Sequence, residues 1–291
     1  MRRTLLATAS SLLVLATSPL FAQTPRVTNG RLIPQPAASG LTATVRTVAA
    51  AQSEPVWIGY TVPSRPGDDT MCCGDNGYWG SCGLEPHDRD RTTVTSGGGT
   101  ARLEGPQSVM ILLRLEDKAV QRIRTFSADC ELDAGGRSIY WLDTVKGADS
   151  ISFLSSFVSD EGKRNDRLSS SALSAIAMHG DAASVPALIK FARQDPSTKV
   201  RGDALFWLAQ RAGEKAAAEI TTAIEQDPDT EVKRRAVFAL SQLPKDEGVP
   251  LLIQTARTNK NPVVRKQAMF WLGQSKDPRA LAFFEEILGK N

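Results

Sequence analysis

The sequence predicts an α+β protein, with a small antiparallel β-rich N-terminal domain followed by an α-solenoid of four helix pairs. Two observations lead to this fold class. From residue 167 to the end, apolar residues with helical spacing recur every 32 residues, and a fixed period of this length is typical of repeat proteins. The preceding part holds short β-branched and aromatic runs between turn residues instead, which is the pattern of strands.

Composition divides the chain into five segments. They are a signal peptide (1–22), a flexible leader (23–40), a β-rich disulfide-stabilised domain (41–146), a capping helix with a linker (147–166) and the solenoid (167–291). With 41% hydrophobic and 23% charged residues, the chain has the composition of an ordinary globular protein. We therefore expect two folded domains after the signal.

The first 22 residues have the pattern of a secretory signal. Arg2 and Arg3 supply the positive start, Leu5–Ala16 the apolar run, and Ala22 the small residue before a cut. The arginine pair also occurs in twin-arginine signals, and the apolar run is too short for an anchor that spans the membrane. We therefore expect a periplasmic or secreted protein that is not inserted in a membrane after cleavage.

The charge balance bears on the class of partner. The formal net charge is +3, and removing the two arginines of the signal leaves a nearly neutral chain. Nucleic-acid-binding proteins usually carry a clear basic excess. We therefore expect no nucleic acid as a partner.

The expected export decides how the cysteines are interpreted. The chain has four of them, Cys72, Cys73, Cys82 and Cys130. An even number in an oxidising compartment favours two disulfides. Adjacent cysteines rarely bond to each other, so we expect one of the first two to pair with Cys82 and the other with Cys130. Free thiols, or a metal site that adds His87, are the alternatives. Zinc usually takes C-x₂₋₄-C spacing, which is absent, so we expect no metal and no cofactor.

In the N-terminal domain, β-branched, aromatic and alternating runs predict strands. The expected strands are Leu41–Val48, Val56–Val62, Gln107–Leu115, Ala119–Phe126 and Ser138–Leu142. A turn at Glu116-Asp117-Lys118 would join two of them as a hairpin. Ser150–Val158 has helical spacing, and we expect it to cover the first end of the solenoid, as terminal units of repeat proteins do.

Within the solenoid, each 32-residue copy predicts two helices. The first carries an alanine column where neighbouring helices should approach closely: Ala172, Ala204, Ala236 and Ala268. It also carries the aromatic column Phe206, Phe238 and Phe270, which we expect in the core between repeats. The second helix has one apolar face, which in the last copy is Leu281, Phe284 and Leu288.

The segment Asp227–Leu240 (DPDTEVKRRAVFAL), with Asp195–Leu208 and Asn261–Leu272 as variants, resembles HEAT repeats of the phycobilisome-lyase-like kind. In the N-terminal part, Trp57-Ile58-Gly59-Tyr60, the cysteine turn, and Asp129–Gly136 followed by Trp141-Leu142 are similar to the leader domain of uncharacterised secreted bacterial HEAT-repeat proteins. The resemblance to HEAT repeats implies an α-solenoid that builds surfaces for other molecules. It also implies that the basic column Arg201, Lys233 and Arg265 pairs with acidic groups of the adjoining repeat.

Few residues in the chain could carry chemistry. Of the two histidines, His87 lies in a charged loop, and His179 ends a predicted helix, where a cation would meet the terminal carbonyls. Neither a G-x-S-x-G elbow nor a dinucleotide-binding glycine pattern is present. Three loop acids, Asp129, Glu131 and Asp133, could bind calcium, although a plain turn is expected.

HEAT-like enzymes offer two comparisons. Deoxyhypusine hydroxylases hold two irons through paired His-Glu motifs, and this chain has no such pair. Bilin lyases have the more similar repeats, but they act on pigments inside the cell. We therefore expect a non-enzymatic exported scaffold or adaptor that binds another protein. The alternative is an envelope enzyme or enzyme accessory whose site lies in the loops of residues 64–100 and 127–136.

The expected partner surface is a stripe on the second helices of the repeats, which we call the second-helix stripe. Its residues recur every 32 positions: Lys190, Thr222 and Gln254, with Arg193, Glu225 and Arg257 beside them. Because the charges are mixed, this stripe suits a protein with its own mixed polar surface rather than a strongly charged ligand.

Overall fold

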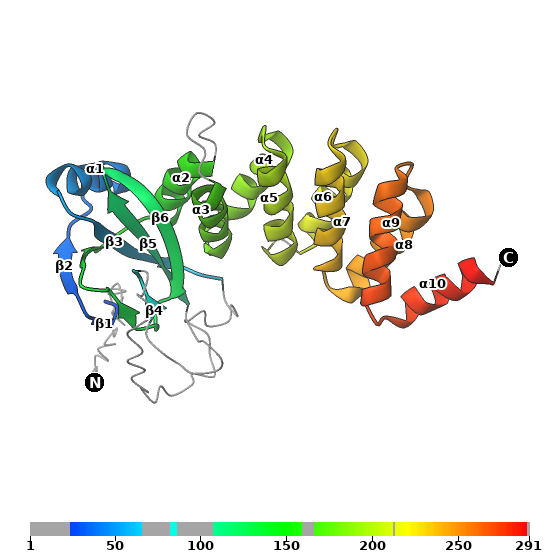
Figure 1. Ribbon diagram of the computed structural model, residues 1–291, viewed down its shortest axis with the longest axis horizontal. Coiled ribbons are helices and arrows are strands. Elements are labelled where there is room, and N and C mark those ends of the chain that lie inside the picture. Colours follow the sequence, from blue (N-terminus) through cyan, green and yellow to red (C-terminus); the bar gives the residue numbers. More distant parts are fainter. Residues whose placement is uncertain (1–23, 66–81, 86–106, 159–165, 212, 290–291) are drawn as a thin grey trace, which may run out of the picture.

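The computed structural model describes residues 24–65, 82–85, 107–158, 166–211 and 213–289 (Figure 1). A part built on β-sheets is followed by a row of helices, and the molecule is elongated along that row (Figure 1). The expected signal peptide, residues 1–22, lies outside the described residues.

The main sheet has five strands in the order β2-β8-β3-β5-β6. Their bounds are Arg31–Gln35 (β2), Ser138–Leu142 (β8), Val56–Pro63 (β3), Ser108–Glu116 (β5) and Ala119–Ser127 (β6). β3, β5 and β6 pair antiparallel, whereas β8 lies parallel to both β2 and β3. The expectation of an antiparallel sheet is therefore wrong, and the sheet is mixed.

The parallel strands follow from a helix that the sequence analysis took for a strand. Residues Leu41–Ala51 form helix α1, which connects β2 to β3 and supplies the crossover that parallel strands require. The residues that α1 buries are spaced three and four apart: Leu41, Thr44, Val45, Val48 and Ala49. The segment therefore has a helical period, which its β-branched residues obscured.

The segment expected to be a flexible leader also contributes structure. It supplies β2 and the short strand β1 (Val27–Thr28). With β7 (Leu132–Asp133) and β4 (Cys82–Gly83), β1 forms a second, three-stranded parallel sheet in the order β1-β7-β4. Three segments that are far apart in the sequence thus meet at one place.

The hairpin between β5 and β6 is confirmed. Asp117 and Lys118, at its tip, have φ angles of 52° and 61°. Two successive positive φ values belong to the tight turns whose twist matches that of paired strands.

Both faces of the main sheet are buried, which explains why β3 and β5 are almost continuously apolar. Ile58, Tyr60 and Ile111 belong to a core that includes residues of α1 and of the repeat helices. Their neighbours Trp57 and Met110 face the other way, into a second cluster with residues of the small sheet. The alternation follows the two-residue period of a strand.

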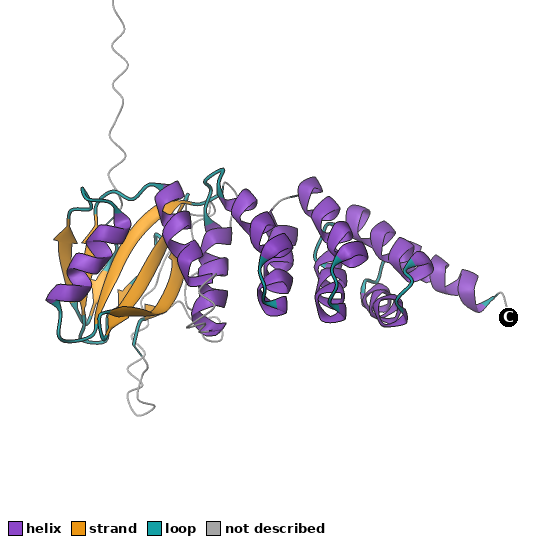
Figure 2. Ribbon diagram, turned by 90° about the horizontal axis from the view of Figure 1, so that it is seen from above, coloured by secondary structure: helices purple, strands orange, loops and turns teal. Residues whose placement is uncertain are grey.

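The rest of the described chain is helical. The bounds are Gly147–Val158 (α2), Asp166–Met178 (α3), Ser184–Gln194 (α4), Thr198–Arg211 (α5), Glu214–Gln226 (α6), Thr230–Ser241 (α7), Lys245–Thr258 (α8), Pro262–Gln274 (α9) and Pro278–Leu288 (α10). Successive helices stack side by side in a row that starts at the sheet (Figure 2). The expected helix at Ser150–Val158 is α2, which contacts α3 and α4.

The alanine column lies where helices pack closely, since all four alanines are fully buried.

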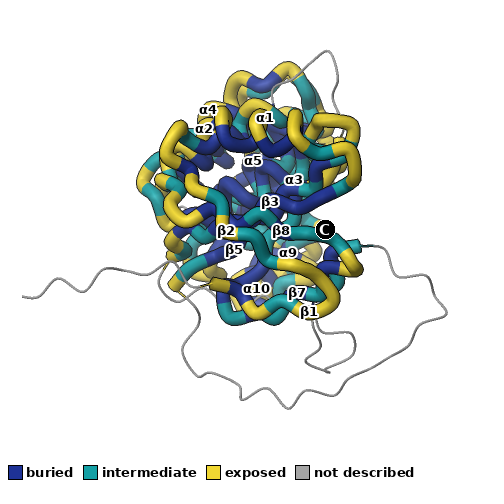
Figure 3. The backbone as a smooth tube through the Cα atoms, turned by 90° about the vertical axis from the view of Figure 1, so that its left-hand side faces the viewer, coloured by how far each residue is buried: buried dark blue, intermediate teal, exposed yellow. Residues whose placement is uncertain are grey.

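Side-chain caps fix where two of the first helices begin. The Asp229 carboxylate accepts hydrogen bonds from the amides of Glu231 and Val232 at the start of α7, and the Asn261 side chain accepts one from the amide of Val263 at the start of α9. Seen along the row, buried residues lie towards the centre of the molecule and exposed residues surround them (Figure 3). No described helix has the length and apolar character needed to cross a membrane.

Helix α10 departs from the register of the other second helices. It buries Ala280 and Phe283, whereas the repeat pattern predicts Leu281, Phe284 and Leu288 on the inside. Arg257 of α8 lies over the Phe283 ring, 5.2 Å from its centroid, and forms an ion pair with Glu286. These contacts hold α10 in a rotated position that turns two leucines outward.

Candidate functional site

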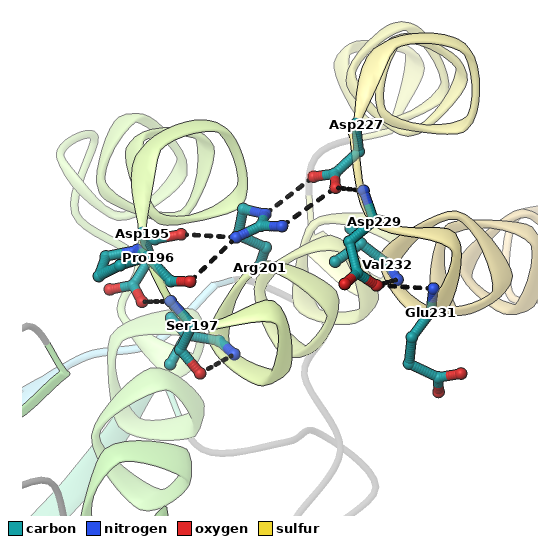
Figure 4. Close-up of polar contacts among 9 residues, drawn as sticks. Asp195, Pro196, Ser197, Arg201, Asp227, Asp229, Glu231 and Val232 are labelled. Atoms are coloured by element: carbon teal, nitrogen blue, oxygen red, sulfur yellow. Dashed lines mark hydrogen bonds and ion pairs between the residues drawn. The ribbon is translucent and has the colours of Figure 1, made fainter.

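The basic column of the repeats is structural. The Arg201 guanidinium donates to both carboxylate oxygens of Asp227 in the next repeat, at 2.8 and 3.0 Å, and to the backbone carbonyls of Asp195 and Pro196 (Figure 4). The expected acidic partner is thus confirmed for Arg201. Lys233 and Arg265 instead donate to backbone carbonyls, those of Glu225 for Lys233 and of Asn259 and Lys260 for Arg265.

The aromatic column forms contacts between repeats, but the expectation that it lies in the core is wrong, because Phe206 and Phe238 are only half-buried and neither belongs to the core cluster. The Phe206 and Phe238 rings are stacked with their centroids 5.8 Å apart, and Phe238 contacts Trp271 at 5.0 Å. Phe270, the last member, contacts the ring of Trp271 on its own helix and is 53% exposed. The column therefore lies at the edge of the core along the row and is most exposed at its C-terminal end.

The second-helix stripe lies on α4, α6 and α8, and its charges are largely used within the molecule. Arg193 donates to both carboxylate oxygens of Glu219, at 2.7 and 2.6 Å, and Arg257 binds Glu286. The Thr222 hydroxyl donates to a carbonyl of its own helix. The remaining members, Lys190, Glu225 and Gln254, have exposed side chains.

His179 is buried, contrary to the expectation of a cation at a helix end. Its Nδ1 lies 2.7 Å from the Ala175 carbonyl oxygen, which can only accept, so Nδ1 carries the proton. Nε2 then accepts from the Ser150 hydroxyl at 2.9 Å, and the Ser150 oxygen accepts from the Tyr60 hydroxyl at 2.8 Å. This chain of hydrogen bonds, which we call the Tyr60–Ser150–His179 chain, connects β3, α2 and the end of α3.

Burial determines the protonation states of His179 and Tyr60 in this chain of hydrogen bonds. Removal from water lowers the pKa of His179 below its usual value and raises the pKa of Tyr60. Both groups are therefore neutral at pH 7. Nothing in the sequence near His179 identifies Ser150 or Tyr60 as its partners, since they come from elements far apart in the chain.

The loops of the N-terminal part meet around the small sheet, at what we call the loop edge. Glu85, two residues after β4, accepts from Trp57 at 2.8 Å and from Arg114 at 2.9 and 3.1 Å. Burial alone would raise the pKa of Glu85, but the hydrogen bonds from Arg114 and Trp57 outweigh it and hold the pKa below its usual value. Glu85 is therefore a carboxylate that fastens the loop to the sheet.

Two of the acids considered for calcium have different environments at this edge. The Asp133 carboxylate accepts from the amide of Gly135 at 2.9 Å and from the Asn29 side chain at 3.1 Å. One carboxylate oxygen of Asp129 is buried and has no hydrogen-bond partner within the described part of the chain. Residues 24–65, 82–85, 107–158, 166–211 and 213–289 contain no group of three or more side chains placed to bind a metal.

Two of the four cysteines can be placed. Cys82 in β4 and Cys130 just before β7 are both buried, in the same apolar cluster. Cys72, Cys73 and His87 lie outside the described residues. The pairing of the cysteines stays a prediction.

Comparison with known proteins identifies the repeats. The family model for HEAT repeats matches residues 217–291, so the C-terminal row of helices contains HEAT repeats. No curated protein is similar to the chain.

Solved structures with similar folds include two enzymes. Human deoxyhypusine hydroxylase is 19% identical over 43% of this chain and 43% of its own length, with a TM-score of 0.36. The CpcE–CpcF complex of phycocyanin lyase from Nostoc sp. PCC7120 is 18% identical over 50% of this chain and 91% of that chain, with a TM-score of 0.38. YibA from Escherichia coli is 24% identical over 48% of this chain and 54% of its own, with a TM-score of 0.34.

These findings correct the expectation of a non-enzymatic scaffold. Among the similar structures are a hydroxylase and a lyase, so HEAT-like repeats of this kind do not mark a chain as lacking enzymatic function. The chain matches less than half the length of deoxyhypusine hydroxylase. At these TM-scores the likeness assigns neither substrate nor activity.

Proposed function

We propose that the protein is an exported enzyme, or an accessory that an exported enzyme requires, with its functional site at the loop edge. This part of the chain holds segments of both loops that the sequence analysis singled out, residues 82–85 and 127–136. Pairing of β7 with β1 and β4 brings them together. Binding sites on loops that a rigid scaffold positions are common in enzymes.

The observation that carries the proposal is the buried carboxylate oxygen of Asp129, which has no hydrogen-bond partner among the described residues. Leaving a buried polar atom without a hydrogen bond costs about 1–3 kcal/mol. Such an atom in a native structure requires an explanation, and a catalytic role is one. A carboxylate oxygen in this state can accept a hydrogen bond from a ligand. We assign this role to Asp129.

The variant Asp129→Asn tests the assignment, because it removes the charge and keeps the shape. We expect the thermal midpoint to stay the same or rise, since no hydrogen bond of that oxygen is lost. We expect hydrolysis of a panel of ester, phosphate, glycoside and peptide substrates, or stimulation of a co-purified enzyme, to be lost. The matched control is Glu131→Gln in the same loop, which should keep the function. An Asp129→Asn variant that is fully functional would refute the proposal.

Export and the disulfides belong to the same proposal. We expect the N-terminus of protein from the periplasm to begin near residue 23. The protein should contain two disulfides, joining Cys82 and Cys130 to Cys72 and Cys73. Two such bridges would tie the loop edge to the sheet, at about 2–5 kcal/mol each. Four alkylatable thiols in protein purified from the periplasm would contradict this arrangement.

A protein partner at the second-helix stripe is the last part of the proposal. Lys190 is its most direct test, because its side chain is exposed on α4 and Arg193 is already paired with Glu219. We expect Lys190→Glu to weaken capture of the partner from envelope extract and to leave the thermal midpoint nearly unchanged. Arg46→Glu, on the exposed face of α1, is the control. Equal capture by the two variants would exclude the stripe as the docking surface.

A further inference from the structure

The apolar residues left exposed in this molecule gather at one end. In the part of the chain that the structure describes, four large hydrophobic side chains are exposed: Val263, Phe270, Leu281 and Leu288. All four belong to α9 and α10, the last two helices of the row (Figure 1). Scattered apolar residues need no explanation, but exposed apolar residues that gather on two helices in contact with each other indicate an interaction site.

The four side chains form two short stripes. Val263 and Phe270 are seven residues apart on α9, and Leu281 and Leu288 are seven apart on α10, so each pair lies on one side of its helix. An exposed charge lies between the members of each pair, Lys266 on α9 and Glu285 on α10. Neither Lys266 nor Glu285 forms an ion pair with any described residue. The two stripes therefore have similar apolar spacing and opposite charge.

The preceding repeat exposes no large apolar side chain at the positions that correspond to these stripes. Phe238 has a ring of a neighbouring repeat on each side, but Phe270 contacts a ring only on its own helix among the described residues. On α8, Val249 and Ala256 are 3% exposed, whereas their counterparts 32 residues later, Leu281 and Leu288, are 62% and 70% exposed. The rotated α10 thus exposes leucines where α8 buries Val249 and Ala256, and α9 exposes Val263 where α7 has the charged Glu231.

We propose that a second copy of this chain covers this end in a two-fold symmetric dimer. The Val263–Lys266–Phe270 stripe of one copy would lie on the Leu281–Glu285–Leu288 stripe of the other, and two-fold symmetry makes the same contact twice. Each contact buries apolar side chains from both copies and sets Lys266 opposite Glu285. A surface that is complementary to itself in this way is what a two-fold homodimer interface requires.

A second copy fits these stripes better than an unrelated protein does. An unrelated partner would need a basic and an acidic apolar stripe of its own, in matching positions. A copy of the same end supplies both by symmetry. The contact would be modest in area, and such interfaces give weak, concentration-dependent association.

The oligomeric state of the full chain is the first test. Sedimentation should show a monomer–dimer equilibrium with a dissociation constant in roughly the micromolar range. Leu281→Glu places a charge in both contacts and should raise that constant about a hundredfold. Ala218→Glu, on the exposed face of α6, is the matched control and should leave it unchanged. A monomer at all concentrations would overturn the proposal.

A charge exchange identifies the contact itself. Lys266→Glu alone and Glu285→Lys alone each set like charges opposite each other in both contacts, so each should weaken the homodimer about tenfold. Mixing the two variants restores an opposite pair in both contacts, so the heterodimer should form with the original affinity. A dimer that both single variants leave intact would show that another surface mediates it. The proposal would then be wrong.

Discussion

His179 shows how burial changes the role of a single residue. From the sequence it is a cation at the end of α3, but the structure buries it and hydrogen-bonds both ring nitrogens. Protonation at Nε2 would reverse the Tyr60–Ser150–His179 chain, because the Ser150 hydroxyl could no longer donate to the ring. The neutral ring is therefore the form that the folded protein stabilises.

This arrangement predicts a pH-dependent stability. The folded-state pKa of His179 lies below the ordinary value of 6.5, so the unfolded chain binds the proton more tightly. The contribution of this group is fully present above pH 6.5 and is lost as the pH falls from 6.5 towards the folded-state pKa. We expect the free energy of unfolding, measured with urea, to decrease over that window. His179→Gln cannot titrate and should show a smaller decrease, so equal decreases would contradict the assignment.

At the scale of the elements, the helices and strands that the sequence predicted correctly are those that a local sequence pattern determines. The hairpin tip, the strands β3, β5, β6 and β8 and the helices of the repeats follow from spacing and turn residues. The α1 segment was misassigned because Leu41–Val48 fits a period of two as well as a helical one. Tertiary packing against the sheet decides between them. The rotation of α10 depends likewise on contacts with α8, which the repeat register does not contain.

The arrangement of the loop edge was missed for the same reason, because it depends on contacts between residues that are far apart in the sequence. Arg201 was expected to pair with an acid of the adjoining repeat because the resemblance to HEAT repeats implies it, and the structure identifies that acid as Asp227. The loop edge has no such pattern: β1 and β7 are paired, yet no period relates their sequences. The buried oxygen of Asp129, which lacks a hydrogen-bond partner in the described part of the chain, is a property of the folded environment and has no signal in the sequence.

The contact between α5 and the start of the next repeat gives a prediction at this scale. The side chains of Arg201 and Asp227 are 11% and 8% exposed, so removing the guanidinium leaves a largely buried carboxylate without its partner. We expect Arg201→Met to lower the free energy of unfolding by about 3 kcal/mol. Arg193→Met removes a pair with Glu219 in which the arginine is exposed to solvent, and it should cost far less than Arg201→Met does. Chemical denaturation measures the free energy of unfolding of both variants. Equal decreases would mean that the Arg201–Asp227 pair is effectively solvated.

At the scale of the whole molecule, the sheet and the HEAT repeats share a core. One continuous set of buried side chains runs from α1 and the sheet to α10, and α3 packs against β6. The join is also tied by polar contacts, because the amide of Gly180, just after α3, donates to the Pro63 carbonyl at 2.7 Å. We therefore expect the N-terminal part and the first repeat to unfold together.

Gly180 gives the sharpest test of this coupling. A Cβ at position 180 would lie 2.6 Å from the backbone oxygen of Ser64 and 2.8 Å from its carbonyl carbon. Backbone at that distance must move, so Gly180→Ala has to push β3 away from the end of α3. We expect it to lower the free energy of unfolding by about 1–3 kcal/mol, and to speed amide hydrogen exchange in both β3 and α3.

The same substitution at Gly273 is the control. Nothing lies within 4 Å of a Cβ built there, and Gly273 is inside α9, where alanine is the better helix former. Gly273→Ala should therefore leave the protein as stable or stabilise it by up to about 1 kcal/mol. If Gly180→Ala accelerates exchange in β3 but leaves α3 protected, the two parts unfold independently. The repeats would then be stable without the sheet that adjoins them, and the shared core would not couple the two halves of the molecule.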